Sequence, residues 1–306
     1  MSEESDIPIL DDWGEEALVS HLVEGLSSHP DLLVGPGDDC AVVEWNPESS
    51  EVALFKTDAV VESIHFESGT DPEQVGRKAV SRTVSDIAAM GGTPRFALVT
   101  LAVDGGRPVR EVEGWYRGIR SAADEYGCVI SGGETTKLPA RGAILSIAML
   151  GKVDRKSCIL RSGGKVGDIL AVTGRLGDSF SSGRHLTFTP RLEEGRWLAE
   201  SGSVRAMMDL SDGLGSDLPR LAAASGTGYE IESLAIPCHE SVSVENAISD
   251  GEDYELLVAV VPGEWDALKR QWEAHFPHCE LTRIGQLSDE TDSKLPSGWE
   301  HYRSSS

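Results

Sequence analysis

The sequence predicts an α/β (α+β) protein built from two domains. Its 306 residues are enough for two domains of ordinary size, each with its own core. In both halves, helical patterns alternate with short apolar runs that are bounded by turn residues. A basic, glycine-rich connection over residues 152–167 separates the two halves. We therefore expect one domain at 1–152 and a second at 153–306.

The first predicted element is a helix near the N-terminus. Asp12 followed by Glu15 forms a capping-box pattern, and Leu18, Leu22 and Leu26 then lie on one helix face. In the rest of the first half, apolar runs between turn residues predict strands, and patterns of helical period predict helices. The expected strands are 40–43, 52–55, 96–103, 129–130 and 143–150, and the expected helices are 72–90 and 112–126.

The second half begins, in this prediction, with a strand at 168–173. The same two patterns then alternate along the remaining chain, which predicts a second α/β unit. The expected strands are 206–209 and 255–261, and the expected helices are 191–199, 217–224 and 264–274.

Net charge limits the classes of partner. The chain carries 51 acidic and 27 basic residues, for a net charge of −24. This excess argues against binding to nucleic acid, which needs a basic surface. It also repels a free nucleotide. If the chain binds ATP, it needs divalent cations between its carboxylates and the phosphates.

Location and redox state follow from three further observations. No apolar run approaches the ~20 residues that span a bilayer, and the acidic N-terminal residues lack the basic-then-apolar order of a signal peptide. The five cysteines are scattered and contain no Cys-x-x-Cys pair, so neither a zinc site nor a disulfide framework is expected. We expect a cytoplasmic protein with reduced thiols and no membrane partner.

Several acidic residues lie inside apolar runs or glycine-rich turns, where a solvated surface does not explain them. Asp86, for example, shares a helix face with Ala79, Thr83 and Met90, so its carboxylate should be buried and needs a partner. One such acid alone is more often a turn former or a helix cap, but six sets in one chain favour a shared function. The sets are Asp38 with Asp39, Asp58, Asp86, Glu134, Asp209 with Asp212, and Glu252 with Asp253 and Glu255.

These oxygen ligands favour magnesium over zinc or copper. Hydroxyl groups of Thr57 and Ser211 lie beside them in the sequence. Several Mg²⁺ ions together with ATP indicate phosphoryl transfer, in which positioning and charge neutralisation provide most of the catalysis. The chain has no Walker-type loop, dinucleotide fingerprint or protein-kinase catalytic loop. We therefore expect metals and turn amides to hold the phosphates.

Taken in chain order, eight segments resemble the thiamine-monophosphate kinases, a family of the aminoimidazole ribonucleotide synthetase-like superfamily. They span nearly the whole chain, and their joint occurrence in this order is specific, whereas SDG alone is weak. The segments are GPGDDCAVV (35–43), TDAVVESIHF (57–66), SRTVSDIAAMGGTP (81–94), SGGETT (131–136), LRSGGKVGD (160–168), MDLSDGLGSDL (208–218), DGEDYELL (250–257) and GWEHY (298–302).

The resemblance implies a fold and a reaction. The N-terminal domain would be β-rich and would serve ATP binding and dimerisation, and the C-terminal α/β domain would complete the substrate site. The expected enzyme is a homodimer that needs several Mg²⁺ ions. It would transfer the γ-phosphoryl group of ATP directly to thiamine monophosphate and form thiamine diphosphate and ADP. The substrate's own phosphate oxygen attacks, so no covalent nucleophile is expected on the enzyme.

The resemblance also implies roles for single residues. Trp299 can stack on the cationic thiazolium, Glu252 can accept a hydrogen bond from the aminopyrimidine, and Arg161 can bind a phosphate through two donors. In full, the expected metal ligands are Asp39, Thr57, Asp58, Asp86, Glu134, Asp209 and Asp212. The expected nucleotide contacts are Tyr116, Gly133, Glu134, Arg161 and Ser211, and the expected substrate contacts are His65, Glu252 and Trp299. Without the motif pattern, a structural role would be the plainer interpretation of His65, Tyr116 and Trp299; with the pattern, a role in the site is favoured.

Three positions depart from the family pattern. Lys56 stands where Thr or Ser usually precedes the Thr-Asp pair, so we expect either fewer metal ions or a lysine that is turned to solvent. Glu134 replaces an aspartate, and its longer side chain would move a bound ion. Asp250 replaces a glycine, which costs backbone freedom if the position needs a positive φ.

Two alternatives remain open. The first is another ATP-using member of the superfamily that acts on a different small substrate. The reactive N-terminal cysteine of selenophosphate synthetase and the C-terminal cysteine of the hydrogenase maturation protein are both missing from this chain. The second is a non-catalytic protein that binds metal and nucleotide, which Lys56, Glu134 and Asp250 would support.

Overall fold

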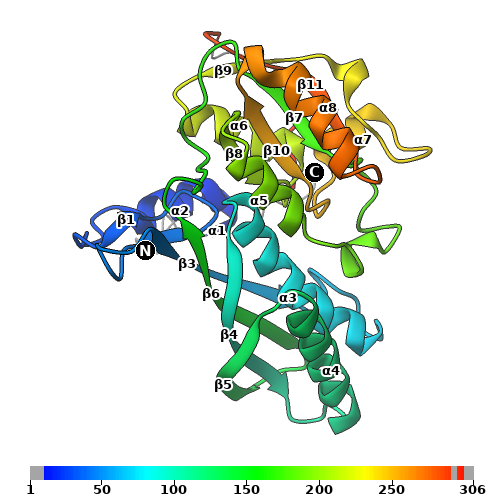
Figure 1. Ribbon diagram of the computed structural model, residues 1–306. Helices are drawn as coiled ribbons and strands as arrows, with labels where there is room; N and C mark the ends of the chain where they lie inside the picture. Colours follow the sequence, from blue (N-terminus) through cyan, green and yellow to red (C-terminus); the bar gives the residue numbers. More distant parts are fainter. Residues whose placement is uncertain (1–9, 291–294, 300–306) are drawn as a thin grey trace, which may run out of the picture.

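The computed structural model describes residues 10–290 and 295–299, and it contains two sheets that follow one another along the chain (Figure 1). Within the described residues, the first sheet has six strands in the order β1-β2-β3-β6-β4-β5. The second has five strands in the order β8-β10-β7-β11-β9. Helices accompany both sheets, so the predicted α/β (α+β) class is confirmed. The boundary near residue 153 stays a prediction.

The first sheet is mostly antiparallel, with one parallel pair between β4 and β5 at its edge. Helices α3 and α4 pack against each other on one face, and α3 contacts β3 and β6. The elements of this half are α1 (Leu10–Trp13), α2 (Glu15–Val23), β1 (Leu32–Val34), β2 (Ala41–Val43), β3 (Glu51–Val61), α3 (Pro72–Ala89), β4 (Thr93–Asp104), α4 (Val109–Glu125), β5 (Val129–Leu138) and β6 (Ala143–Asp154).

In the second sheet every strand pair is antiparallel. Alternate residues of the buried strands β7 and β10 belong to two apolar clusters, one that includes α6 and one that includes α5 and α8. The elements are β7 (Ile169–Thr173), α5 (Leu192–Glu200), β8 (Val204–Asp209), α6 (Leu214–Ala224), β9 (Gly228–Ile231), α7 (Val244–Ser249), β10 (Leu256–Val260), α8 (Trp265–His275) and β11 (Leu281–Ser288), with short 3₁₀ turns Arg184–Leu186, Ser233–Ala235 and Pro262–Glu264.

Helix α3 joins the two halves. Its N-cap Asp71 accepts a hydrogen bond from the Glu73 N–H at 2.8 Å, and Pro72 begins the helix without an amide donor to satisfy. The helix contacts α5 and β8 of the second half as well as the first sheet. At Gly195 on α5, an added Cβ would lie 2.2 Å from the Ala88 carbonyl oxygen. Only glycine lets the two backbones approach this closely.

Most elements match the prediction to within a few residues, but four expectations were wrong. The N-terminal helix is split by Gly14, whose φ of 73° ends α1 before α2 begins. Strand β3 runs to Val61, so Asp58 lies inside it and not after it. Strand β5 likewise runs through Glu134 to Leu138. Three strands were not predicted at all, namely β1, β9 and β11.

No helix among the described residues is long and apolar enough to cross a bilayer.

Candidate active site

Three of the predicted carboxylates meet between the two halves. Each of Asp39, Asp86 and Asp209 offers an oxygen that lies within 4.8 Å of the other two, and all three residues are buried. Asp39 precedes β2, Asp86 lies near the end of α3, and Asp209 ends β8. The first half therefore contributes two of these carboxylates and the second half contributes one.

The chemistry of this cluster fits a divalent cation. Arg161 donates to one oxygen of Asp39, at 3.1 Å from Nε and 2.5 Å from Nη2. The other oxygen of Asp39 is buried and has no hydrogen-bond partner in the described part of the chain. Burial, and then the charge of Asp39, raise the pKa of Asp209 to about 7. Carboxylate oxygens are the ligands that Mg²⁺ prefers.

Lys56 is directed at this cluster and is not turned to solvent. Residues alternate between the two faces of a strand, so Lys56 and Asp58 share one face of β3 while Thr57 lies on the other. Lys56 Nζ is 2.6 Å from Asp86 Oδ1. Burial acts to raise the pKa of Asp58, but the charges of Lys56 and Arg82 outweigh it and lower the pKa. Of the two expectations for Lys56, a lysine turned to solvent was wrong, and the expectation of fewer metal ions stays a prediction.

A pocket of about 570 Å³ lies next to the carboxylates. Five of its lining residues were predicted as site residues: His65, Ser211, Asp212, Glu252 and Trp299. The backbone N–H of Trp299 donates to the Asp212 carbonyl oxygen at 2.9 Å, which connects the tryptophan to the loop after β8. The ring centroids of His65 and Trp299 are 6.5 Å apart. The pocket thus has an aromatic wall beside the carboxylate cluster.

Glu252 is held as a carboxylate by two basic side chains. Lys78, which is fully buried, has its Nζ 2.7 Å from Oε1 and 2.8 Å from Oε2 of Glu252. His185 Nδ1 lies 3.2 Å from Glu252 Oε2. Burial acts to raise the pKa of Glu252, but the His185 hydrogen bond and the Lys78 charge outweigh it and hold the pKa at about 2. Glu252 is therefore an acceptor at the pocket wall at neutral pH.

Sequence reasoning missed three basic residues of this site: Lys78, Arg82 and His185. Lys78, Arg82 and Asp86 follow one another at intervals of four, which places them on one face of α3. That spacing of charges on one face of a helix that carries Val75, Ala79 and Ile87 was the available signal. Nothing in the sequence around His185 identified it.

Comparison with known proteins places the chain in a family. Residues 37–153 match the model for the N-terminal domain of AIR synthase related proteins, and residues 162–296 match the model for the C-terminal domain. The thiamine-monophosphate kinase of Rhodopirellula baltica is 37% identical over 295 residues, covering 90% of both chains. That of Bacillus subtilis is 33% identical and covers 87% of this chain and 89% of its own.

The chain belongs to the thiamine-monophosphate kinase family. A solved structure of AaThiL complexed with AMPPCP and TMP matches it with a TM-score of 0.84 and 30% sequence identity. The match covers 97% of this chain and 100% of that one. The family resemblance read from the motifs is therefore confirmed.

Other residues with expected roles in a thiamine-monophosphate kinase lie apart from the carboxylate cluster. Gly133 and Glu134 are exposed on the edge strand β5, and strands β6 and β4 lie between it and the strand of Asp58. Gly133 also has a packing reason, since an added Cβ would lie 1.8 Å from the Val99 carbonyl oxygen. Tyr116 on α4 packs against the N-terminal core. The roles of these residues stay predictions.

Two further positions have partners within the chain. The Thr57 hydroxyl lies 3.5 Å from that of Ser146, on the face of β3 opposite Asp58. Asp250 has a φ of −70°, and its carboxylate accepts a hydrogen bond from the Asp178 N–H at 2.8 Å. The replacement of a family glycine by Asp250 therefore carries no strain from a positive φ.

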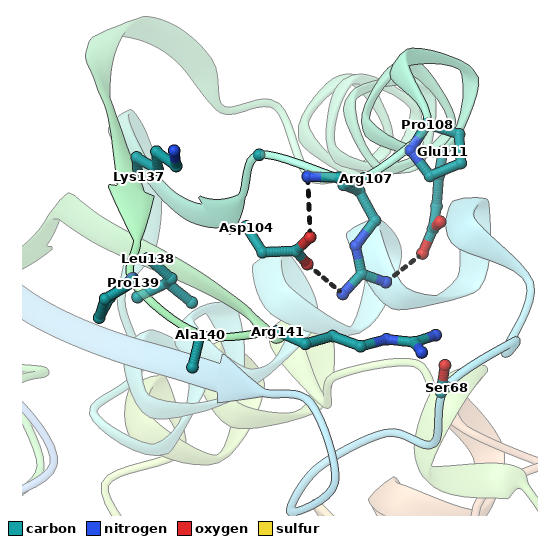
Figure 2. Close-up of a pocket in the computed structure, with 12 residues that line it drawn as sticks. Ser68, Asp104, Arg107, Pro108, Glu111, Lys137, Leu138, Pro139, Ala140 and Arg141 are labelled. Carbon is teal, nitrogen blue, oxygen red and sulfur yellow. Dashed lines mark hydrogen bonds and ion pairs between the residues drawn. The ribbon is translucent and has the colours of Figure 1, made fainter.

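A second cavity, of about 740 Å³, lies away from this site at the ends of β4 and β5. Figure 2 shows Arg107 beside it, bonded to Asp104 and Glu111. Its guanidinium also pairs with Glu62. None of the predicted site residues lines this cavity. Although this cavity is larger, its acidic residues Asp104 and Glu111 are paired with Arg107, so we assign the active site to the smaller pocket beside Asp39, Asp86 and Asp209.

Proposed function

We propose that this chain is a Mg²⁺-dependent kinase that transfers the γ-phosphoryl group of ATP directly to thiamine monophosphate. The observation that carries the proposal is the meeting of Asp39, Asp86 and Asp209 beside a pocket lined by Glu252 and Trp299. The family membership supports it, because the curated relatives are thiamine-monophosphate kinases. AaThiL was solved with AMPPCP and TMP, which supports ATP as the co-substrate here.

Asp39, Asp86 and Asp209 would hold the Mg²⁺, with Asp58 and Asp212 as further ligands at the edges of the cluster. When bound, Mg²⁺ supplies charge neutralisation for the phosphate oxygens. The resemblance alone supports Thr57 and Glu134 as additional ligands and Tyr116 and Gly133 as nucleotide contacts. Arg161, which holds Asp39 in this structure, can also direct its guanidinium to a phosphate.

The pocket residues hold the acceptor. Trp299 presents an indole face to a cationic thiazolium, an interaction worth about 2 kcal/mol or more when desolvated. Glu252, ionised and fixed by Lys78 and His185, accepts a hydrogen bond from the aminopyrimidine. No side chain needs to act as nucleophile, because the acceptor phosphate supplies the attacking oxygen. The chain orients the two phosphates and shields them from water.

We also propose that two copies of the chain form a dimer through the first sheet. The face of this sheet opposite α3 and α4 exposes Phe55, Phe96, Leu98 and Val129, each between 39% and 56% accessible. Phe96 pairs with Val129 across β4 and β5, so the apolar groups are continuous. A second copy would cover this surface.

The cytoplasmic location expected from the sequence stays a prediction.

The direct test is product analysis with the full chain. ATP and thiamine monophosphate are incubated with Mg²⁺ or with EDTA, and thiamine diphosphate is separated by chromatography. We expect thiamine diphosphate and ADP in equal amounts with Mg²⁺ and neither with EDTA. Unphosphorylated thiamine should give no product. Consumption of ATP without formation of thiamine diphosphate would instead indicate another superfamily reaction.

A further inference from the structure

An arginine, Arg82, lines the pocket that is proposed to hold the acceptor. It lines the same 570 Å³ pocket as Glu252 and Trp299. It lies one helical turn after Lys78 and one turn before Asp86 on α3. We propose that Arg82 binds the phosphate group of the acceptor, so that it selects a phosphorylated substrate over its free alcohol. This inference rests on the proposed function and adds a residue that the sequence motifs did not assign.

The position of Arg82 along α3 matches the order of groups in such a substrate. At one end of these three residues, Lys78 holds Glu252, the residue proposed above to bind the heterocycle. At the other end, Asp86 belongs to the carboxylate cluster. Each step of four residues advances about 6 Å along a helix. Arg82 therefore lies midway between the ring-binding wall and the phosphoryl-transfer site, where the acceptor phosphate must be.

Several N–H donors of the Arg82 guanidinium make no hydrogen bond within the described residues. Nη1 donates to the Ala59 carbonyl oxygen at 3.0 Å, the one hydrogen bond that Arg82 makes in the described part of the chain. The buried Nε has no hydrogen-bond partner there. A guanidinium carries five N–H groups, and leaving buried donors unsatisfied costs about 1–3 kcal/mol each. A phosphate supplies the acceptors that this side chain lacks.

Against the effect of burial, the charge of Arg82 helps to lower the pKa of the nearby Asp58 and Glu252, but these carboxylates do not satisfy its N–H donors. Glu252 is already paired with Lys78 and His185, and Asp86 is already paired with Lys56. No hydrogen bond joins Arg82 to a carboxylate among the described residues. Its charge instead lowers the repulsion that these acids would exert on an incoming phosphate dianion. To bind the phosphate, Arg82 must contact the substrate directly.

The experiment compares two ligands on two arginine variants by titration calorimetry, without ATP. The ligands are thiamine monophosphate and thiamine, and the variant is Arg82→Gln. The matched control is Arg77→Gln on the same helix, because Arg77 pairs with Glu125 outside the pocket. We expect Arg82→Gln to weaken binding of thiamine monophosphate about 10-fold or more and to leave thiamine binding within about 2-fold. The control should change neither.

The outcomes separate the inference from the function on which it rests. If wild type binds thiamine monophosphate and Arg82→Gln binds it equally well, or loses both ligands in parallel, Arg82 is structural and the inference fails. If wild type does not bind thiamine monophosphate, the proposed function itself fails. If Arg82→Gln does not fold, Arg82→Lys replaces it as the test variant, because lysine keeps the positive charge but cannot bind a phosphate in a bidentate way. It should lose part of the preference for the phosphorylated ligand, and an unchanged preference would contradict the inference.

Discussion

At the scale of single residues, Lys56 affects how many divalent ions the carboxylates beside it can bind. Its ammonium lies 2.6 Å from Asp86 and shares a strand face with Asp58. Burial acts to lower the pKa of Lys56, but the charges of Asp86 and Asp58 outweigh it and raise the pKa, so this cation is permanent at any physiological pH. A permanent cation between two carboxylates occupies space and charge that a divalent ion would otherwise take.

Replacing Lys56 should therefore open a second metal position. Lys56→Met leaves Asp58 and Asp86 adjacent and uncompensated, a costly arrangement in a buried site. We expect it to bind about one more Mn²⁺ per chain than wild type, counted by electron paramagnetic resonance without nucleotide. Lys152→Met is the matched control, because Lys152 on β6 pairs with Glu51 at the start of β3, away from the cluster. Equal Mn²⁺ counts for all three proteins would show that Lys56 replaces no ion.

Asp253 gives a dependence of stability on pH. Burial raises its pKa to about 8, although hydrogen bonds from the Gly177 N–H act in the opposite direction. An unfolded aspartate has a pKa of about 3.9. Between these values the folded chain keeps a proton that the unfolded chain has lost. The free energy of unfolding should therefore fall as the pH rises from about 4 to 8.

Asp253→Asn cannot titrate, so its free energy of unfolding should fall less over the same interval. We expect the difference from wild type to be at least about 1 kcal/mol between pH 5 and pH 8, measured by urea unfolding. Asp266→Asn, at an exposed position on α8, should behave as wild type. Parallel pH profiles for wild type and Asp253→Asn would show that Asp253 is ionised in the folded chain.

At the scale of elements, α3 determines how the two halves meet. It carries Lys78, Arg82 and Asp86 on one face, and its end packs against α5 at Gly195. The approach of Gly195 to the Ala88 carbonyl brings the second half, with Asp209, next to Asp86. The geometry of the carboxylate cluster thus depends on a contact between two helix backbones.

An alanine at position 195 should disturb this contact. Its Cβ would lie 2.2 Å from the Ala88 carbonyl oxygen, so the helices must separate. We expect Gly195→Ala to lower the free energy of unfolding by about 1–3 kcal/mol and to weaken Mn²⁺ binding. Gly263→Ala, where an added Cβ meets no heavy atom within 4 Å, should have little effect. Normal Mn²⁺ affinity in Gly195→Ala would mean that α5 packing does not position Asp209.

Elements and site differ in how well the sequence predicted them. Helix α3 was predicted well because its helical period is regular, and Gly91-Gly92 directly after it act as a stop signal. Strand β11 was missed, because Arg283 and Gly285 interrupt its apolar pattern at a bulge. Asp39, Asp86 and Asp209 were identified as unusual acids, but their meeting depends on how two distant chain segments pack. Lys78 and His185 were missed because their partners are distant in sequence.

At the scale of the whole molecule, the exposed apolar face of the first sheet should determine the oligomeric state. Leu98→Glu places a charge at the centre of this face, where Leu98 is 50% accessible. We expect wild type to be a dimer and Leu98→Glu a monomer by light scattering, because a charge would have to be buried without a partner. Leu234→Glu, at a position 98% accessible in the second half, should remain a dimer. A monomeric wild type would refute the proposed dimer.

The central claim is that carboxylates from both halves form one metal site on which phosphoryl transfer depends. The most direct measurement is the rate of thiamine diphosphate formation as a function of Mg²⁺ concentration, for wild type, Asp209→Asn and the surface control Asp266→Asn. Asp209→Asn should need about 10-fold more Mg²⁺ or lose activity altogether, while the control follows wild type. An Asp209→Asn enzyme with the wild-type rate and Mg²⁺ dependence would contradict the claim.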